Sequence, residues 1–484
     1  SSWTDAYSSS ISALMSSLPS ADIQRILFDS FFTDPFLAEG ITLLQTQFME
    51  QLKTVTERQG QRSREGDATT LANAFAILGT ALRIMPDETS RLLLASSTAG
   101  MYGHLQPKSL SRIISPQLAS HLDPTPLDQR YFDLALICSQ MAESGDTPSV
   151  MLVMLKLVLY RNLAMRKDRQ TVSGQYLCGA IKIAQTMGLG KEWEWQPLGE
   201  REMKRRIMWS LYVADRHLSF ETAVPYTLLE AHQGIHLPSP ISEHDLHQLA
   251  PDATALPPHK TELGPTPCTA LFLHTHLARK ITPILDSFAT LSPSKTPHGL
   301  VLGFDQSLDT FQEKLPTYMR FFPLTDTRWD SSHAYLSAHR IRLHARILAY
   351  RQGVHRSFII TYLRPSAPAG IRGVMAHICL SSLRTQRSAK MLDPKIAPRI
   401  YEPLVVFESA MILGLILYVD RAMTIGQGAA PAPEAMMWRE GLANGVELLD
   451  NISAGVAGDA ARKAVKVLRE MSAKVDASPQ ETKL

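Results

Sequence analysis

One stretch near the middle of the chain, Glu200–Leu229, constrains the fold more than any other part of the sequence. Its apolar residues recur at 3.6 residues per turn, as they do in a helix that buries one face. Two glutamates stand at its start, where the positive end of a helix dipole favours anions. The stretch therefore predicts an amphipathic helix, whose apolar stripe is formed by Ile207, Leu211 and Leu218 with Met208, Trp209 and Tyr212 beside it.

The polar residues of this stretch predict its surface pairs and its end. Glu202 and Arg206 are four residues apart, so we expect them to pair along the helix surface. Ser219 and then Pro225 mark the place where the helix should give way to an extended connection.

The rest of the chain also favours helices. Ser149–Tyr160 is almost continuously apolar but too short to cross a membrane, which predicts a helix buried on all sides. No segment alternates like a strand, and no internal repeat is present. We therefore expect an all-α fold, a large array of packed antiparallel helices without a significant sheet. Further helices are expected at Thr69–Met85, Glu88–Met101, Leu110–Leu122, Pro126–Ala142, Thr171–Met187, Ser331–Gln352, Gly370–Met391, Ile400–Met423, Ala435–Ile452 and Asp459–Ala473.

Charge and hydropathy narrow the class of protein. A net charge of +3 with 20% charged residues argues against this chain being the main nucleic-acid contact, which needs concentrated Lys and Arg. The N-terminus has no secretory signal. The longest apolar stretch, Leu404–Val419, contains Glu408 and is too short to span a bilayer comfortably. We expect a soluble intracellular protein that makes no membrane contact.

Metal, phosphate and catalytic motifs are weak or missing. The cysteines at 138, 178, 268 and 379 lack C-x-x-C spacing, so reduced thiols are expected. A metal site among the histidines at 232, 236, 244, 247, 259, 274 and 276 is weighed against solvated loop histidines, and no metal site is expected. Gly188-Leu189-Gly190-Lys191 lacks the spacing of a phosphate loop and predicts a left-handed glycine at a helix end. No nucleophile–base pattern is present, so we expect no catalytic residues and no enzyme.

The polar and aromatic residues of the central stretch also form a motif. The pattern R-R-x-x-W-x-x-Y-x-x-D-R-x-x-S with a downstream proline follows the segment Met187–Glu192. It resembles the central signature of the fungal-specific transcription factor domain, the helical regulatory region of fungal zinc binuclear cluster regulators. The matching residues are Arg205, Arg206, Trp209, Tyr212, Asp215, Arg216, Ser219 and Pro225. The sequence departs from the family at Ala223-Val224, where Gly-Arg is usual, and at Gly190, where His is usual.

The resemblance implies a function and partners. It indicates the effector-sensing and dimerisation region of a nuclear regulator of RNA polymerase II transcription. Its expected partners are a second copy, a small-molecule effector and the transcription machinery or co-regulators. DNA contact would come only through a zinc cluster with six closely spaced cysteines, which this chain lacks; zinc is expected there and no cofactor here. The absence of an initiator Met at Ser1 favours a truncated piece.

We predict one helical unit with an interruption. Residues 1–245 hold the N-terminal and central helices, with the signature at 171–240. Residues 246–303 form a Pro- and His-rich connection with a helix-like piece at Thr269–Phe288, 304–475 form the C-terminal helical half, and 476–484 form a disordered tail.

Two hypotheses concern the residues of the signature. Arg205 or Arg206, together with Asp215 and Arg216, is expected to form an ion-pair network that ties the helix to its neighbours, because unpaired buried charge is costly. A possible ligand pocket is lined by Met208, Trp209, Tyr212 and Phe220, with ordinary core packing as the other interpretation. Two other classes of protein stay open: a helical protein–protein adaptor or small-molecule receptor without its own DNA-binding domain, and, less favoured, an enzyme with a helical active site.

Overall fold

The computed structural model describes residues 2–58, 61–85, 127–165, 170–232, 234–249, 253, 255–256, 264–290, 297–321, 325–364, 366–367, 369–392, 403–427, 433–451 and 458–476. Within these ranges all regular structure is helical, and the only β-type pairing is an isolated parallel bridge between Lys191 and Gly234. The predicted all-α class is confirmed. The helices expected at Glu88–Met101 and Leu110–Leu122 lie outside the described residues.

The chain divides into two compact units, Ser1–Ala278 and Arg279–Leu484. The division lies within helix α13, Thr269–Thr290, and so inside the segment 246–303 that the sequence suggested as a connection. Besides α13, that segment contains the end of α12, Glu243–His247, and the start of α14, His298–Glu313. Asp476 ends the last described helix, and the rest of the predicted tail lies outside the described residues.

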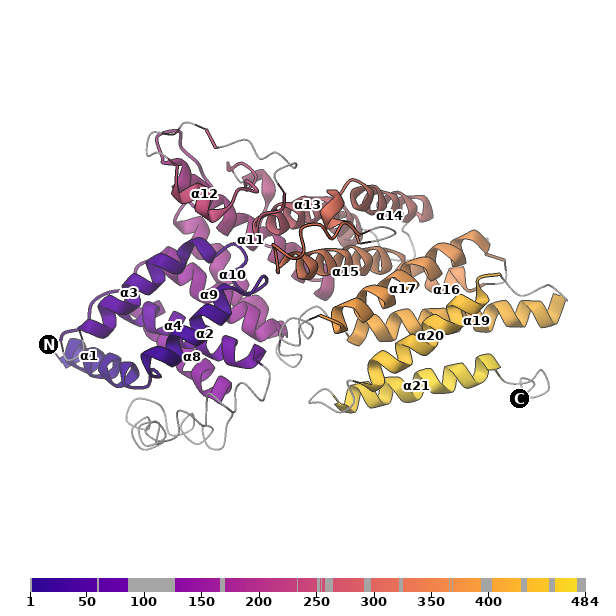
Figure 1. Cartoon of the computed structure of the whole chain (residues 1–484), viewed down its shortest axis with the longest axis horizontal. Helices are drawn as coiled ribbons and strands as arrows, with labels where there is room; N and C mark the ends of the chain where they lie inside the picture. Colours follow the sequence, from indigo (N-terminus) through magenta and orange to yellow (C-terminus); the bar gives the residue numbers. More distant parts are fainter. Residues whose placement is uncertain are drawn as a thin grey trace. The chain divides into compact units, whose positions relative to one another are not determined.

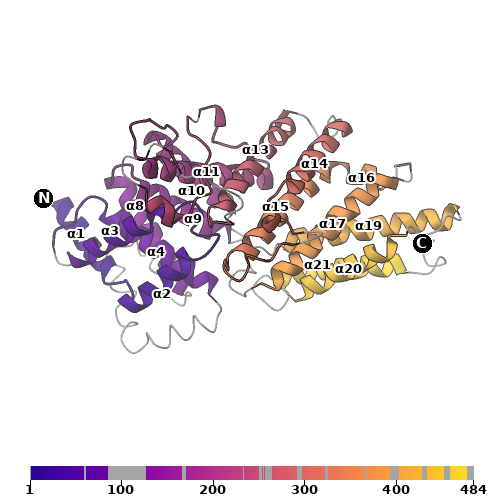
Figure 2. The same ribbon diagram turned by 45° about the horizontal axis from the view of Figure 1, so that its top comes forward.

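Helix α4, Asp67–Ile84, forms the centre of the first unit, with α8 and α9 packed against it (Figures 1 and 2). Every residue of α4 from Asp67 to Leu82 is buried. Its small residues allow close approach: a Cβ atom on Gly79 would lie 2.8 Å from the carbonyl oxygen of Asp128. Besides α12 and the start of α13, the other α-helices among the described residues of this unit are α1 Ser2–Met15, α2 Ala21–Phe32, α3 Gln45–Glu57, α8 Leu127–Gly145, α9 Val150–Ala164, α10 Gln170–Thr186 and α11 Leu198–Thr222.

Helix α9 confirms the prediction of a helix buried on all sides. Its residues from Met151 to Tyr160 are all buried, Lys156 included. The helix begins after Ser149, whose hydroxyl accepts a hydrogen bond from the backbone N–H of Leu152 at 3.2 Å. The ammonium of Lys156 contacts the carboxylate of Glu143 at 2.5 Å, so the charge on the buried side chain has a partner.

The second unit is built from α14, α15 Leu336–His355, α16 Ile359–Tyr362, α17 Ala369–Lys390, α19 Pro403–Gln427, α20 Ala435–Asp450 and α21 Gly458–Asp476. Helix α19 contacts α17, α20 and α21. Glycines on α20 allow this packing, because a Cβ atom on Gly445 would lie 2.4 Å from the Cβ of Ala410. The apolar core of this unit includes Leu413, Ile416, Trp438 and Leu468.

Helix α19 corrects one expectation. The apolar run at Leu404–Val419 was judged too short to span a bilayer, but the helix continues to Gln427. The part Pro403–Thr424 has 22 residues and a mean hydropathy of 1.8, so one described helix is long and apolar enough to cross a membrane by length and composition. The apolar run ended at a polar residue, whereas the helix ends where its backbone hydrogen bonds end. A core helix of a helical protein has the same composition, and α19 packs in the core of its unit.

Candidate functional site

The signature residues lie on helix α11, and the chain then turns back along the same helix. Helix α11 ends at Thr222, and Ala223 has a left-handed backbone with φ +57°. No other non-glycine residue has positive φ in the described part of the chain. We call residues 223–241 the strap; its described residues are 223–232 and 234–241. Helix α11 ends before Pro225, as predicted, and Pro225 lies exposed near the start of the strap.

The best-satisfied side chain of the site is the carboxylate of Asp215. It accepts hydrogen bonds from the backbone N–H of Thr227, at 3.0 and 2.9 Å to its two oxygens, and from that of Leu228 at 2.8 Å. Arg216 donates to the same carboxylate at 2.9 Å and to the carbonyl oxygen of Leu228 at 2.6 Å. Together, Asp215 accepts from backbone N–H groups of the strap, and Arg216 donates to a backbone carbonyl of the strap.

The guanidinium of Arg216 also lies between two aromatic rings. It is 4.1 Å from the ring centre of Tyr212 and 3.6 Å from that of Tyr226 in the strap. The hydroxyl of Tyr212 donates to the carboxylate of Glu230 at 2.9 Å. Only 1% of Arg216 is exposed, so these contacts replace water around a fully buried cation.

Further signature residues bind the strap on either side of Tyr212 and Arg216. Near the C-terminal end, the hydroxyl of Ser219 donates to the carbonyl oxygen of Val224 at 2.6 Å. Further along, the indole N–H of Trp209 donates to the carbonyl oxygen of His236 at 2.7 Å. From Ser219 back to Trp209, each step of three or four residues along the helix therefore meets a later residue of the strap.

Glu202 and Arg206 are paired, but the expectation of a surface pair is wrong. Their exposed fractions are 0% and 1%, and the guanidinium donates to the carboxylate at 3.0 Å. Glu202 also accepts from the backbone N–H of Ser239 at 2.9 Å, and Arg206 donates to the carbonyl oxygen of Ile241 at 3.0 Å. The i, i+4 spacing fixes only that the two residues share a face, and the strap covers that face.

Glu192, which the sequence did not single out as a site residue, links the α10–α11 connection to the strap. It accepts two hydrogen bonds from Arg205, both at 2.7 Å, and a third from the backbone N–H of His236 at 3.0 Å. Gly234 donates its backbone N–H to the carbonyl oxygen of Gly190 at 2.8 Å. Glu192 lies within the MGLGKE segment that accompanies the motif, so its position was the available signal.

Burial and pairing shift the pKa values of these acids in opposite directions. Burial raises the pKa values of Glu202 and Asp215 above their usual range, although their arginine partners act to lower them. Burial also acts to raise the pKa of Glu192, but its hydrogen bonds from Arg205 and His236 outweigh burial and lower it. In the same pair, the hydrogen bond to Glu192 raises the pKa of Arg205.

The ion pairs predicted for the signature fall into two groups. Arg205 and Arg206 bind Glu192 and Glu202, whereas Arg216 binds its neighbour Asp215. The polar side chains of the signature therefore bind mainly the backbone of the strap.

Most of the residues suggested to line a ligand pocket are buried in the core of the first unit. Met208, Trp209 and Tyr212 are buried, with exposed fractions of 1%, 4% and 1%, and Phe220 is half-buried. The rings of Trp209 and Tyr212 pack edge to face with centres 5.0 Å apart. Trp209 and Tyr212 direct their polar atoms at the strap, and a pocket lined by the four residues stays a prediction.

The glycine at the end of α10 behaves as predicted. Gly188 has φ +68°, and the backbone N–H of Leu189 donates to the carbonyl oxygen of Ala184 at 3.0 Å. Among the described residues, no group of three or more His, Cys, Asp or Glu side chains is arranged to hold a metal ion. His259, one of the histidines weighed as a ligand, lies outside the described ranges.

Comparison with known proteins identifies the family of the chain. The model of the fungal specific transcription factor domain matches residues 26–315, which include α11 and the whole strap. The chain belongs to this family. It is therefore a regulatory region of the fungal transcription factor type, and proteins of this family are in general not enzymes. Among curated proteins, no sequence matches the chain.

Proposed function

We propose that this regulatory region senses a small effector, forms a homodimer and passes the signal to DNA binding or activation in the nucleus. The observation that carries the proposal is the family match over residues 26–315, which covers the complete signature and its strap. In this proposal no bond is made or broken. An effector or partner protein shifts an equilibrium between conformers of the helical array.

We further propose that DNA is contacted by a binuclear zinc cluster outside these 484 residues. The resemblance of the signature to zinc-cluster regulators supports this assignment, and so does the near-balanced charge of the chain, which suits a signal-receiving region better than a phosphate-binding one. Co-regulators and the transcription machinery would then bind the same protein through its helical surface.

The test is the zinc content per chain of the full-length protein isolated from its source, measured together with its mass in solution. A zinc content that matches a binuclear cluster, in a particle of twice the chain mass, is the expected result. Absence of zinc would favour the alternative, a helical adaptor or small-molecule receptor without its own DNA-binding domain. A monomer at all accessible concentrations would contradict the dimer.

A further inference from the structure

Two tryptophans are exposed in the connection between α10 and α11. Trp193 and Trp195 are 54% and 78% exposed, whereas Trp209 and Trp438 are 4% and 6% exposed. Tryptophan is a large side chain that is highly buried on average. Exposed aromatic surface is typical of sites where proteins bind partners. Residues Trp193–Gln196, which we call the tryptophan turn, are therefore a candidate interaction surface.

Hydrogen bonds hold the tryptophan turn in one conformation. The backbone N–H of Gln196 donates to the carbonyl oxygen of Trp193 at 3.0 Å, and the side-chain oxygen of Gln196 accepts from the N–H of Trp193 at 3.1 Å. Gln196 is only 5% exposed, and its amide donates to the carboxylate of Glu200 at 2.9 Å. Just before the turn, Glu192 is bound by Arg205 and by the strap. Indoles on a segment held in this way lose little conformational freedom when a partner binds.

The carboxylate of Glu194 stands between the two tryptophans in the sequence. Glu194 is exposed, and no described residue forms a hydrogen bond or an ion pair with it. The faces of the neighbouring indoles also attract cations, because the ring quadrupole places negative charge there. The turn therefore combines two groups that favour a positively charged partner.

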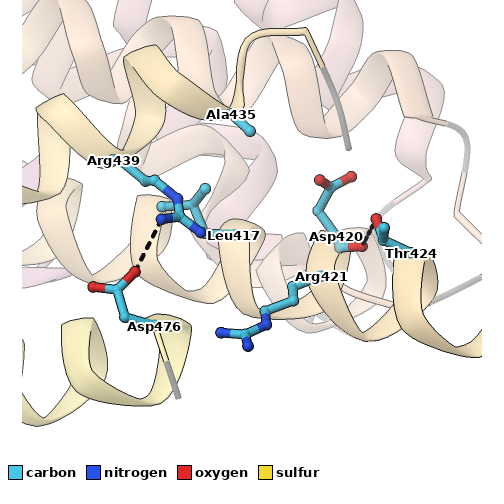
Figure 3. A pocket seen from close by; sticks show the side chains of 7 residues that line it. All are labelled: Leu417, Asp420, Arg421, Thr424, Ala435, Arg439 and Asp476. Atoms are coloured by element: carbon cyan, nitrogen blue, oxygen red, sulfur yellow. Dashed lines mark hydrogen bonds and ion pairs between the residues drawn. The ribbon is translucent and has the colours of Figure 1, made fainter. Parts of the chain in front are cut away.

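The charged side chains of the pocket between α19, α20 and α21 are, by contrast, already paired (Figure 3). Arg439 pairs with Asp476 at 3.0 Å, and Arg421 donates to the carbonyl oxygen of Val475. Asp420, which also lines the pocket, has a partner as well. A ligand there would have to displace existing contacts, whereas a cation can reach Glu194 without displacing any.

We propose that the tryptophan turn binds a basic segment of a partner protein. A guanidinium or ammonium group of the partner stacks on the exposed indoles and pairs with the carboxylate of Glu194. A nucleic-acid phosphate would lie beside that carboxylate and be repelled by it. Small ligands prefer concave sites, which an exposed turn is not. The inference rests on the partner binding proposed above and names its site and the charge of the partner.

The experiment titrates the full 484-residue chain with a fluorescein-labelled peptide of arginines and records the fluorescence anisotropy. The net charge of the chain is +3, so such a peptide is not attracted to the chain as a whole. A glutamate peptide of the same length is expected to bind at least about 10-fold more weakly. Added salt should weaken the binding of the arginine peptide, because its ion pair with Glu194 is exposed to solvent.

Two substitutions in the turn test the aromatic and the acidic part separately. Trp195→Ala should weaken binding of the arginine peptide about 10-fold or more, because aromatic anchors carry much of the energy of an interface. Glu194→Lys should also weaken it about 10-fold or more and should strengthen binding of the glutamate peptide. All these positions are exposed, so unfolding curves in urea should stay unchanged.

Two substitutions on α20 are the matched controls. Met436 is as exposed as Trp195, at 78%, and Glu440 is an exposed acid like Glu194. Met436→Ala and Glu440→Lys should therefore bind the arginine peptide as the wild type does.

Absence of binding by the arginine peptide, or unchanged binding by both turn variants, would overturn the proposal. A fall in mass from dimer to monomer in Trp195→Ala would also overturn it, because the turn would then bind a second copy of the chain. Zinc content and mass of the unaltered full-length protein are measured separately, so failure at the turn leaves those two results to decide the proposed function.

Discussion

Both units of the chain contain a buried network of charged side chains, but one network binds backbone groups and the other binds side chains. In the first unit, acids and arginines of one helix, α11, bind the backbone of the strap that follows it. In the second unit, side chains of α14, α15 and α16 bind one another. Arg351 donates to Asp305 at 2.7 and 3.0 Å and also contacts Asp309.

The second network continues from Asp305 through His355 of α15 to Tyr362 of α16. The Nδ1 atom of His355 is 2.9 Å from the hydroxyl of Tyr362, and its Nε2 atom is 3.6 Å from Asp305. His298 approaches the same tyrosine hydroxyl at 3.2 Å. Burial acts to raise the pKa of Asp305, but the contacts of its carboxylate with His355 and Arg351 outweigh burial and lower the pKa to about 2.

The difference between the networks follows from how well the backbone groups of the neighbouring segment are already hydrogen-bonded. Apart from one 3-10 turn at Glu230–His232, the strap is irregular, so many of its backbone N–H and C=O groups exchange hydrogen bonds with buried side chains. Helices α14, α15 and α16 satisfy most of their own backbone groups, and their buried charges need other side chains. The first network therefore joins side chains to backbone groups, whereas the second joins side chains to one another.

The largest expected effect comes from Asp215→Ala, because the change leaves the N–H groups of Thr227 and Leu228 and the Arg216 guanidinium without their shared acceptor. We expect a loss of about 4 kcal/mol in the free energy of unfolding. Urea unfolding followed by the fluorescence of Trp209 measures it in the first unit. Glu50→Ala, at an exposed position of α3, should cost about 0.5 kcal/mol or less. Equal effects of the two changes would mean that Asp215 behaves as a surface acid.

The matching change in the second unit is Arg351→Met, which leaves Asp305 and Asp309 without their cation. Breaking a buried pair from one side should cost about 3 kcal/mol, seen in the fluorescence of Trp329 and Trp438 on urea unfolding. Arg328→Met removes an exposed partner of Asp326 and should cause no measurable change. A shift of the first unit alone in Arg351→Met would contradict the separation of the two networks.

The stability of the second unit should depend on pH through the buried His344. Burial lowers the pKa of His344 to about 4, below its ordinary value of 6.5, and its Nε2 atom lies 3.1 Å from the carbonyl oxygen of Met319. Between these values the unfolded chain binds a proton that the folded chain does not, so stability falls as the pH decreases from 6.5 to 4. The loss should reach at most about 3 kcal/mol. His344→Gln should flatten this part of the stability curve; an unchanged slope would assign it to other groups.

The smallest effect is a gain of stability at the start of the strap. Ala223 has φ +57°, a conformation that glycine adopts without strain. Ala223→Gly should therefore raise the free energy of unfolding by about 0.5–1 kcal/mol, despite the greater freedom of glycine in the unfolded chain. Ala214→Gly, inside α11, is the control and should lower stability instead. A loss at both positions would show that the left-handed turn is not strained.

The strap also shows how far the motif could be interpreted from the sequence. The spacing of Trp209, Tyr212 and Ser219 placed these residues on one helix, and α11 confirms the helix. The same spacing could not show what faces that side, so Glu202 was assigned to the surface although it is fully buried. Glu230 and the carbonyl groups of the strap were missed, because their partners depend on where an irregular segment returns.

The pocket beside α19 was missed for a related reason. The sequence predicts a helix at Ile400–Met423, and α19 spans Pro403–Gln427, but the prediction did not show that Asp420 and Arg421 line a pocket formed with α20 and α21. No local pattern indicates that these residues face Arg439 and Asp476, because the helices that bring them together are separate in sequence.

The sequence by itself determined the helical class, a buried helix at Ser149–Tyr160, a left-handed glycine at the end of the following helix, and the resemblance to the family that the domain match then showed. These features depend on periodicity, on backbone preference and on a contiguous motif, all of which act over a few turns. Only the tertiary structure decided which charges are buried, how the strap is held, and which residues of α14, α15 and α16 pair. Those outcomes depend on desolvation and on the partners that packing provides, and neither is a property of a local segment.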